Sequence, residues 1–219
     1  MDQDKLNNQS NYWEANFSKK PLMFGLTPSV AALSALKKFE EDNIKEIIEL
    51  GAGLGRDTVF FAKNNIKVEA LDYSPTAIRT IQEKIKDNNL FDLISAKYFD
   101  LRNKLPFKDN SIDGIFSHML YCMALTNSEV KKLNNEILRV LKPGGINIYT
   151  VRNLNDGDYK KGIHMGEEMY ENDGFIINFF SEKKVKSLLK GFENLSIINF
   201  EEGNFPRKLF LIQNKKKEI

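Results

Sequence analysis

The chain of 219 residues has a single cysteine, Cys122, and only two histidines, His118 and His164. One thiol excludes an intrachain disulfide and a zinc site built from several cysteines. Neither histidine stands in a metal-binding motif such as H-x-x-H or H-E-x-x-H. We therefore predict no metal ion and a reducing compartment, the cytoplasm. Cys122 lies between Tyr121 and Met123 and is expected to be a small buried residue, not a nucleophile.

Long apolar runs and an excess of charge of one sign are missing as well. No uninterrupted apolar stretch approaches the ~20 residues that span a bilayer, and the N-terminus carries no apolar signal region. The sequence has 32 lysines and arginines and 30 aspartates and glutamates. This near balance argues against a broad basic surface that would bind nucleic acid. We therefore expect neither a membrane nor a nucleic acid as a partner. The run Lys215-Lys216-Lys217 is expected to be a solvated tail.

What the sequence does contain is a glycine-rich turn between a strand and a helix. Residues 45–50 have the pattern of a short strand, Gly51, Gly53 and Gly55 follow, and residues 58–63 have the pattern of the first helical turns. A turn of this kind brings the backbone of a doubly wound α/β sheet close to a nucleotide-like ligand. The same glycines could also serve only to permit a sharp turn.

An acidic residue and the glycine spacing further restrict the class of nucleotide-like ligand that the turn can bind. The next predicted strand, 67–71, ends in Asp72, where a carboxylate can accept hydrogen bonds from both hydroxyls of a ribose. A dinucleotide fingerprint, G-x-G-x-x-G, requires a third glycine where this chain has Arg56. Because that glycine allows close packing beneath a pyrophosphate, the turn favours a ligand without phosphates.

Three further motifs follow along the chain. They are Leu105-Pro106-Phe107, the stretch from Ser111 to Ser117, and Leu141-Lys142-Pro143-Gly144-Gly145. Together with the E-x-G-x-G-x-G of residues 49–55, this series resembles the class I S-adenosylmethionine-dependent methyltransferases, most strongly from about residue 45 to 151. A more distant likeness, to small-molecule methyltransferases of the tellurite-resistance and thiopurine type, rests on the compact size and the C-terminal pattern.

The resemblance implies that S-adenosylmethionine is the cofactor and that residues following four successive strands hold it. The glycine turn would approach its methionine part, the acid after the second strand its ribose, the residues after the third strand its adenine, and the backbone after the fourth strand its reacting methyl group. The candidate cofactor site consists of Gly51, Gly53, Arg56, Asp72, Tyr73, Asp100, Leu101 and Ser117. Tyr73 could stack on the adenine or ribose, or only cover the sheet end, and Asp100 could be a plain loop acid.

Strand and helix patterns alternate over most of the chain, which indicates parallel strands with right-handed crossovers. An amphipathic helix is predicted from Val30, Leu33, Leu36 and Phe39, and another begins at Ser74-Pro75 with an N-cap serine and a proline at the first helical position. The predicted fold class is α/β: a Rossmann-like, doubly wound, mostly parallel seven-stranded sheet with an antiparallel hairpin at its C-terminal edge.

The C-terminal third departs from this alternation. Residues 152–178 are polar, contain four glycines and show no long periodic element, so we predict an irregular acceptor-site loop there. A helix is expected around residues 185–192. Two β-rich runs, 195–200 and 208–213, are joined by the short link 201–207, which forces an antiparallel hairpin.

Residues 1–28 form a candidate lid-like segment, because they contain Tyr12, Trp13, Phe17 and Phe24. These aromatic side chains would close over the cofactor or pack into the core. His118 directly follows the fourth strand, at the ligand-binding edge of such sheets. It is a weak catalytic candidate, because a neutral imidazole there could take a proton from an acceptor or simply hydrogen-bond to a loop carbonyl.

We therefore predict one methyltransferase domain over residues 1–219 that transfers the sulfonium methyl group to a small-molecule acceptor, as a monomer or homodimer. The sulfonium is a good leaving group, so the protein mainly has to align acceptor and methyl and exclude water. Two alternatives stay open, a methyltransferase acting on a protein or RNA and a non-catalytic S-adenosylmethionine-binding protein. An NAD-dependent oxidoreductase would need the missing third glycine.

Overall fold

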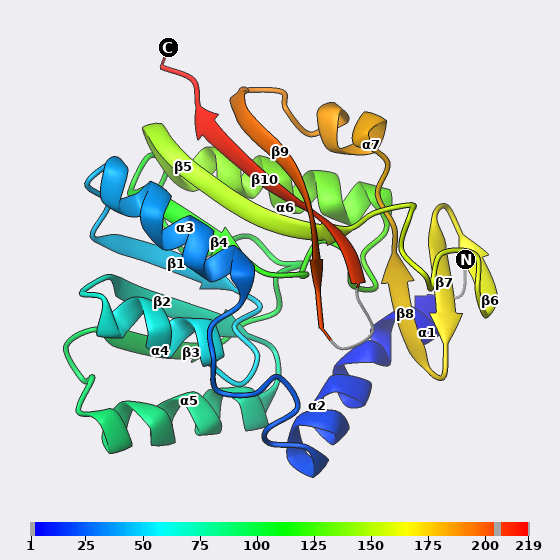
Figure 1. Cartoon of the computed structure of the whole chain (residues 1–219), viewed down its shortest axis with the longest axis horizontal. Coiled ribbons are helices and arrows are strands. Elements are labelled where there is room, and N and C mark those ends of the chain that lie inside the picture. Colours follow the sequence, from blue (N-terminus) through cyan, green and yellow to red (C-terminus); the bar gives the residue numbers. More distant parts are fainter. Residues whose placement is uncertain (1–2, 204–206, 219) are drawn as a thin grey trace.

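A central sheet of seven strands organises the protein, which we describe from a computed structural model over residues 3–203 and 207–218 (Figure 1). The strand order is β3-β2-β1-β4-β5-β10-β9. Strands β1 to β5 are parallel, and β10 runs antiparallel to β5 and β9. The strands are β1 (Glu46–Leu50), β2 (Lys67–Asp72), β3 (Ile94–Tyr98), β4 (Ile112–Ser117), β5 (Leu141–Arg152), β9 (Phe192–Glu202) and β10 (Arg207–Lys216). The predicted fold class and the reversed C-terminal edge are confirmed; residues 204–206 of the predicted hairpin link lie outside the described residues.

Helices cover both faces of this sheet, and each face has its own apolar core. One face carries α3, α4 and α5, and the other carries α6 and the short α7 (Figure 1). Their bounds are α3 (Val30–Glu41), α4 (Arg56–Lys63), α5 (Pro75–Asn88), α6 (Asn127–Val140) and α7 (Glu182–Ser187). The helix expected around 185–192 is therefore shorter and earlier, because Phe192 already belongs to β9. Among the described residues, no helix is long and apolar enough to cross a membrane.

The start of α5 follows the predicted capping chemistry. The Ser74 hydroxyl oxygen accepts a hydrogen bond from the Ala77 N–H at 3.0 Å, and Pro75 occupies the first helical position. An N-cap serine satisfies one of the backbone donors that a helix start leaves unpaired, and proline has no N–H to satisfy there. This start lies directly after Asp72, so the helix begins next to the candidate ribose site.

The predicted apolar face of α3 is wrong in part. Val30 and Leu33 are 49% and 52% exposed, whereas Ala31 and Ala35 are fully buried together with Phe39. Small alanines let the helix lie close to its neighbours, and the larger side chains then turn outward. The rotation of the helix is further constrained at its start, where the Ser29 N–H and hydroxyl donate to the buried Asp57 carboxylate at 2.8 and 2.7 Å.

Residues 152–178 contain regular structure, which corrects the prediction of an irregular loop. Three short strands, β6 (Ile163–Gly166), β7 (Met169–Asn172) and β8 (Phe175–Asn178), form a separate antiparallel sheet. Alternation over only four residues is too short to stand out in the sequence. The apolar residues of this segment, Met165, Met169 and Ile176, pack in a small core with Leu6.

The N-terminal segment forms two helices, α1 (Gln3–Asn7) and α2 (Gln9–Lys19). Helix α2 lies between the small sheet and α5 (Figure 1). Its Glu14 carboxylate accepts hydrogen bonds from the Ser74 and Thr76 hydroxyls, each at 2.5 Å, and from the Thr76 N–H at 3.1 Å. Acceptors at a helix N-terminus are favourable because the unpaired N–H groups and the helix dipole face them. Helix α2 is therefore docked on the start of α5.

The predicted solvated tail at 215–217 is wrong for its middle residue. The Lys216 side chain is buried, and its Nζ donates to Asn110 Oδ1 and to the carbonyls of Leu138 and Leu141, each at 2.7 Å. The two carbonyls lie at the C-terminal end of α6, where unpaired acceptors and the helix dipole favour a cation. Alternation along β10 turns this lysine inward, which a charge run does not reveal.

Replacing Lys216 by methionine is expected to lower the free energy of unfolding by about 2 kcal/mol, because three acceptors lose their donor while the apolar stem keeps its packing. Urea unfolding measures the change. The exposed neighbour provides the control, since Lys217→Met should alter stability by less than about 0.5 kcal/mol. Equal stability of the two variants would show that the Lys216 ammonium does not hold the end of α6.

Candidate cofactor and acceptor site

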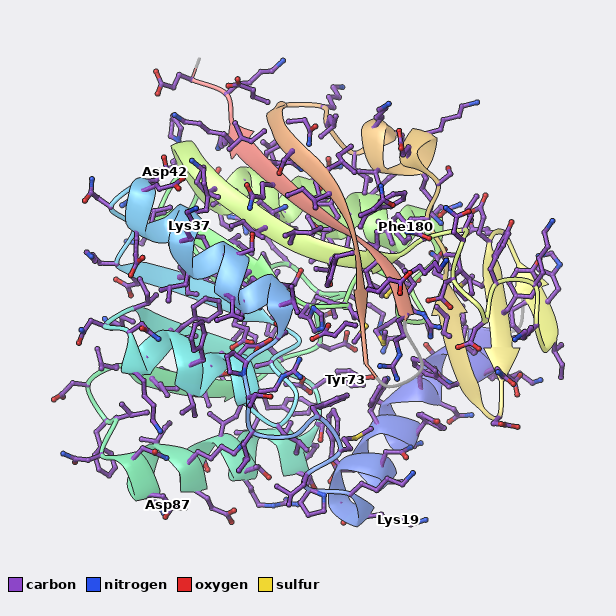
Figure 2. All side chains as sticks on the ribbon, in the orientation of Figure 1. Lys19, Lys37, Asp42, Tyr73, Asp87 and Phe180 are labelled. Atoms are coloured by element: carbon purple, nitrogen blue, oxygen red, sulfur yellow. The ribbon has the colours of Figure 1, made fainter. Side chains whose placement is uncertain are left out.

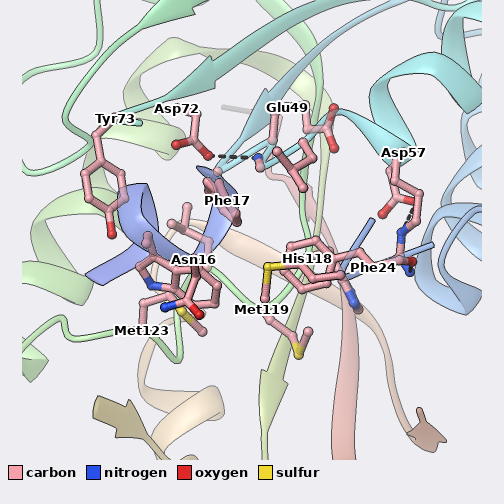
Figure 3. Close-up of a pocket in the computed structure, with 18 of the residues that line it drawn as sticks. Asn16, Phe17, Phe24, Glu49, Asp57, Asp72, Tyr73, His118, Met119 and Met123 are labelled. Atoms are coloured by element: carbon pink, nitrogen blue, oxygen red, sulfur yellow. Dashed lines mark hydrogen bonds and ion pairs between the residues drawn. The ribbon is translucent and has the colours of Figure 1, made fainter. Parts of the chain in front are cut away.

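A cavity of about 240 Å³ lies where the strand order reverses between β1 and β4. Open α/β sheets bind ligands at this point, outside the carboxyl ends of the strands. Figure 3 shows Glu49 and Asp72 on one side of the cavity and Asn16 and Phe17 of α2 close by. The candidate residues that line it are Gly51, Gly53, Arg56, Asp72, Tyr73 and His118.

Asp100, Leu101 and Ser117 are not part of this lining. The Asp100 carboxylate is bound by the Arg102 guanidinium, with 2.7 Å from Nη2 to Oδ2. Leu101 is buried in the core under α6. Ser117 is fully buried, and its Oγ has no hydrogen-bond partner among the described residues. A contact of these three residues with the adenine and the methyl group therefore stays a prediction.

The glycines of the turn have different reasons to be glycine. Gly53 has φ +54°, a conformation that other residues adopt rarely, and its N–H donates to Asp72 Oδ2 at 2.8 Å. Gly55 has φ +77°, and a Cβ there would lie 2.6 Å from Cγ1 of Ile81 on α5. Gly55 thus permits α5 to pack against the turn, whereas the Gly53 N–H connects the turn to Asp72, the candidate ribose-binding acid.

Asp72 ends β2 and is 3% exposed. Its Oδ2 accepts from the Gly53 N–H and its Oδ1 from the Ser74 N–H at 2.9 Å. Each carboxylate oxygen keeps a second lone pair, so both can still accept a hydroxyl proton. Burial raises the pKa of Asp72 to about 6, although the backbone donors lower it in part. The geometry fits a ribose with two adjacent hydroxyls.

Three buried carboxylates surround the glycine turn. Glu49 and Asp57 line the cavity with Asp72, and all three are at most 5% exposed. Burial raises the pKa of Glu49 well above its usual value, and the charges of Asp57 and Asp72 raise it further. Asp72, which is ionised above about pH 6, would repel an anionic diphosphate and attract a ligand that carries a sulfonium and an ammonium group.

Cofactor affinity is expected to fall as the pH drops through about 6. The ribose hydroxyls donate to the charged form of Asp72, and that carboxylate takes up a proton near its raised pKa of about 6 in the free protein. Isothermal titration with S-adenosylhomocysteine between pH 5 and pH 8 measures the effect, with the steepest loss expected below about pH 6. An affinity that stays constant over this range would contradict an ionised Asp72 as the ribose acceptor.

One ring nitrogen of His118 is hydrogen-bonded, and the other lies within ion-pair distance of Glu202 but has no hydrogen-bond partner among the described residues. Its Nδ1 lies 3.0 Å from Thr150 Oγ1, and its Nε2 lies 2.9 Å from Oε2 of Glu202. Burial raises the pKa of Glu202, but His118, Arg56 and the Val30 N–H lower it more, so the carboxylate is held ionised. Proton transfer by His118 stays a prediction. It would require one ring nitrogen to lose its contact with Glu202 or Thr150, so that this nitrogen can face the acceptor.

Aromatic side chains of the N-terminal segment and of β8 form one wall of the cavity. Phe17 and Phe24 lie against the glycine turn, because a Cβ at Gly53 would be 3.7 and 3.8 Å from their rings. Trp13 contacts Phe17, Phe24 and Phe175, with ring centroids 5.3, 6.4 and 5.2 Å away. Tyr12 stacks on Phe175 at 5.8 Å. All five rings line the cavity, so the N-terminal aromatics face the site and also pack on one another.

Sequence reasoning missed three features of this site. Phe175 is brought in by β8, which was not predicted, and Glu202 reaches His118 only because the end of β9 lies close to the residue that follows β4. Asp57 was not predicted as a site residue, yet it is buried, forms an ion pair with Arg56 and fixes the start of α3. Only the apolar character of 175–177 hinted that this segment is folded.

Sequence comparison relates part of this chain to known methyltransferases. Residues 47–145 match the family described as a methyltransferase domain. Phosphoethanolamine N-methyltransferase from Triticum aestivum is 34% identical over 148 residues, which cover 63% of this chain and 28% of the relative. Demethylmenaquinone methyltransferase from Tropheryma whipplei is 31% identical over 101 residues, covering 46% of this chain and 39% of the relative.

A solved structure extends the likeness to the whole chain. The 1,6-didemethyltoxoflavin-N1-methyltransferase of Burkholderia thailandensis, with S-adenosylhomocysteine bound, has a TM-score of 0.77 and 13% identity, and the match covers 100% of this chain and 91% of that one. The chain spans only 20 to 39% of the length of the curated relatives it matches. From the matched span, the strand order and the glycine turn, we conclude that residues 47–145 are similar to the methyltransferase-domain family and that the chain has the class I methyltransferase fold.

Proposed function

We propose that the whole chain is one enzyme domain that transfers the methyl group of S-adenosylmethionine to a small-molecule acceptor. The observation that carries the proposal is the set of buried carboxylates, Glu49, Asp57 and Asp72, around a glycine turn in the cavity. Named relatives act on phosphoethanolamine, demethylmenaquinone and 1,6-didemethyltoxoflavin, which supports a small acceptor but does not identify it. The cytoplasm stays the predicted compartment, because the single thiol, Cys122, is buried and unpaired.

Different residues of the cavity would bind the cofactor and exclude water from it. When bound, S-adenosylmethionine supplies a methyl group on a sulfonium, which is a good leaving group. Asp72 would hold the ribose, and the backbone of the turn through Gly51 and Gly53 would approach the methionine part. Trp13 and the other four rings of the aromatic wall exclude water, which favours transfer over hydrolysis and strengthens electrostatic interactions inside the cavity.

Cofactor choice and turnover test the proposal separately. Isothermal titration should show binding of S-adenosylmethionine and S-adenosylhomocysteine but not of NAD. Tighter binding of NAD than of S-adenosylhomocysteine would refute the proposal. A thermal-shift screen of small amines, phenols and thiols in the presence of S-adenosylhomocysteine would then find acceptors, and formation of S-adenosylhomocysteine from S-adenosylmethionine confirms turnover. Binding without turnover for every acceptor class would favour the non-catalytic alternative.

We propose that the acceptor binds against the aromatic wall, where residues 152–178 contribute through β8. Phe175 lines the cavity, while Tyr159, His164 and Tyr170 of the same segment do not. Tyr159 instead packs on Tyr170 and Phe179, 5.6 and 5.4 Å between centroids. Arg152 lines the cavity as well, but its guanidinium is bound by Asp156 and Asp158, so the contribution of this segment to acceptor binding rests on Phe175.

Replacing Phe175 by alanine is expected to raise KM for the acceptor about tenfold, because a buried ring contributes roughly 1.5–3 kcal/mol. Affinity for S-adenosylhomocysteine should change little, since Asp72 and the glycine turn are untouched. Steady-state kinetics and isothermal titration measure the two quantities. Tyr159→Ala is the matched control, and a larger KM effect there than at Phe175 would place the acceptor behind the small sheet.

A further inference from the structure

Exposed apolar side chains are concentrated in one short segment of the surface. Ten large hydrophobic side chains are exposed among the described residues, and five of them fall within residues 22–33. Leu22 and Leu26 are 67% and 73% exposed, and Val30 and Leu33 on the first turns of α3 are 49% and 52% exposed. A dense group of exposed apolar side chains marks an interaction surface. We call residues 19–37 the apolar segment.

The same segment carries positive charge only. From residue 15 to residue 39 the chain has four lysines and no aspartate or glutamate. Lys19, Lys20 and Lys37 are exposed and have no ion-pair partner among residues 3–203 and 207–218, whereas Lys38 pairs with Asp42 at 2.8 Å. Figure 2 labels Lys19 at the end of α2 and Lys37 on α3, at the two ends of the segment.

No acid of the described residues forms an ion pair with these three exposed lysines, although Glu40 and Glu41 follow Lys37 on α3 and Glu41 pairs with Lys38. The Asp57 carboxylate is bound to Ser29 and is 5% exposed. Glu202 faces His118, Arg56 and the Val30 N–H. Glu14 is bound at the start of α5. The apolar segment therefore combines exposed leucines with cations, the combination that binds an anionic lipid surface.

The segment also lies at the wall of the cavity. Met23 and Phe24, in the middle of the exposed stretch, line the cavity, and the Phe24 carbonyl accepts a hydrogen bond from Arg56 Nη1 at 3.0 Å. A surface that held Leu22 and Leu26 would thus lie next to the aromatic wall and the methionines Met119 and Met123. This continuity gives an apolar molecule a path from the surface into the site.

We propose that the apolar segment docks the protein peripherally on an anionic phospholipid surface, with Leu22 and Leu26 inserted between headgroups and Lys19, Lys20 and Lys37 on the phosphates. The sequence-based expectation of no membrane partner rested on the lack of a spanning run, and peripheral docking needs no such run. A consequence, which rests on the proposed function, is that the acceptor is an amphiphile held at the same surface.

Vesicle sedimentation tests the docking without any methyl transfer. The protein is mixed with vesicles of phosphatidylcholine alone and of equal parts phosphatidylcholine and phosphatidylglycerol, and the partition coefficient is measured. We expect the wild type to bind the anionic vesicles. The double variant Leu22→Ser/Leu26→Ser should bind them about tenfold more weakly. Lys19→Gln with Lys20→Gln should weaken binding about tenfold on anionic vesicles and should not weaken it on neutral ones.

Phe91→Ser is the matched control, because Phe91 is 61% exposed in the turn before β3, an edge strand of the sheet, and lies outside the apolar segment. This variant should bind vesicles like the wild type. Failure of the wild type to bind anionic vesicles, or equal binding by the Leu22→Ser/Leu26→Ser variant, would overturn the proposal. A wild-type dimer in sedimentation velocity that this double variant converts to monomer would assign the segment to self-association and overturn it as well. Isothermal titration with S-adenosylhomocysteine tests the proposed function independently, so the two failures are distinguishable.

Discussion

Replacing Asp72 by alanine is expected to weaken S-adenosylhomocysteine binding by roughly 2–4 kcal/mol, or about 30-fold to 800-fold. Both carboxylate oxygens have a lone pair available for a ribose hydroxyl, and hydrogen bonds to a charged acceptor in a buried site are strong. Isothermal titration at pH 7.5 measures the loss. A dissociation constant within about threefold of the wild type would mean that Asp72 does not hold the ribose.

The thermal stability of this variant separates ligand binding from folding. Asp72 has a raised pKa in the folded state, about 6 against the usual 3.8, so its ionisation costs the fold on the order of 3 kcal/mol, a penalty absent below about pH 4 and complete above about pH 6. Alanine removes this penalty but leaves the Gly53 and Ser74 N–H groups without an acceptor. These effects oppose each other, so the melting temperature should stay close to that of the wild type. A large drop in the melting temperature would indicate that Asp72→Ala loses affinity because the glycine turn is distorted. Asp72→Asn, which keeps the shape of the side chain, would then be the decisive comparison.

Replacing Arg152 by methionine is expected to lower the free energy of unfolding by about 3–5 kcal/mol, because it leaves a buried carboxylate unpaired. The Arg152 and Asp156 side chains are 4% and 1% exposed. Arg152 Nε donates to Asp156 Oδ2 at 3.0 Å, and Nη2 donates to Asp156 Oδ1 and, at 2.6 Å, to Asp158. Urea unfolding measures the change.

Two comparisons make this prediction specific. Lys142→Met breaks an ion pair with Asp113 whose side chains are 45% and 46% exposed, so it should cost less than about 1 kcal/mol. Combining Arg152→Met with Asp156→Asn removes both charges, keeps one of the two oxygens that accept from the Asp158 and Lys208 N–H groups, and should restore part of the lost stability. A double variant less stable than Arg152→Met would show that the unpaired charge is not the cause of the destabilisation.

The cofactor half of the site was predictable because its signals are local. The strand before Gly51, the acid at the end of the next strand and the N-cap Ser74 each depend on neighbours within a few residues, and the structure has all of them in place. The parallel sheet follows from the alternation of strands and helices, which restricts the connection to one hand.

The remainder depends on contacts between distant residues, which no local pattern records. Val30 and Leu33 have helical spacing, but Ala31 and Ala35 face the core, since close packing there excludes larger side chains. Lys216 belongs to a charge run, yet its neighbours in space are carbonyls of α6, about 75 residues earlier in the chain. The pairing of His118 with Glu202 likewise exists only because the hairpin edge folds back toward β4.

The two walls of the cavity come from different stretches of the chain, and this division has a consequence for engineering the site. Glu49, Asp72 and the glycine turn lie within the span shared with other methyltransferases, whereas Trp13 and Phe175 lie outside it. Insertions or exchanges in α2 or the small sheet would therefore change the aromatic wall without changing the span that matches the methyltransferase-domain family. On the proposed function, α2 and β6–β8 are the segments to exchange when a new acceptor specificity is engineered.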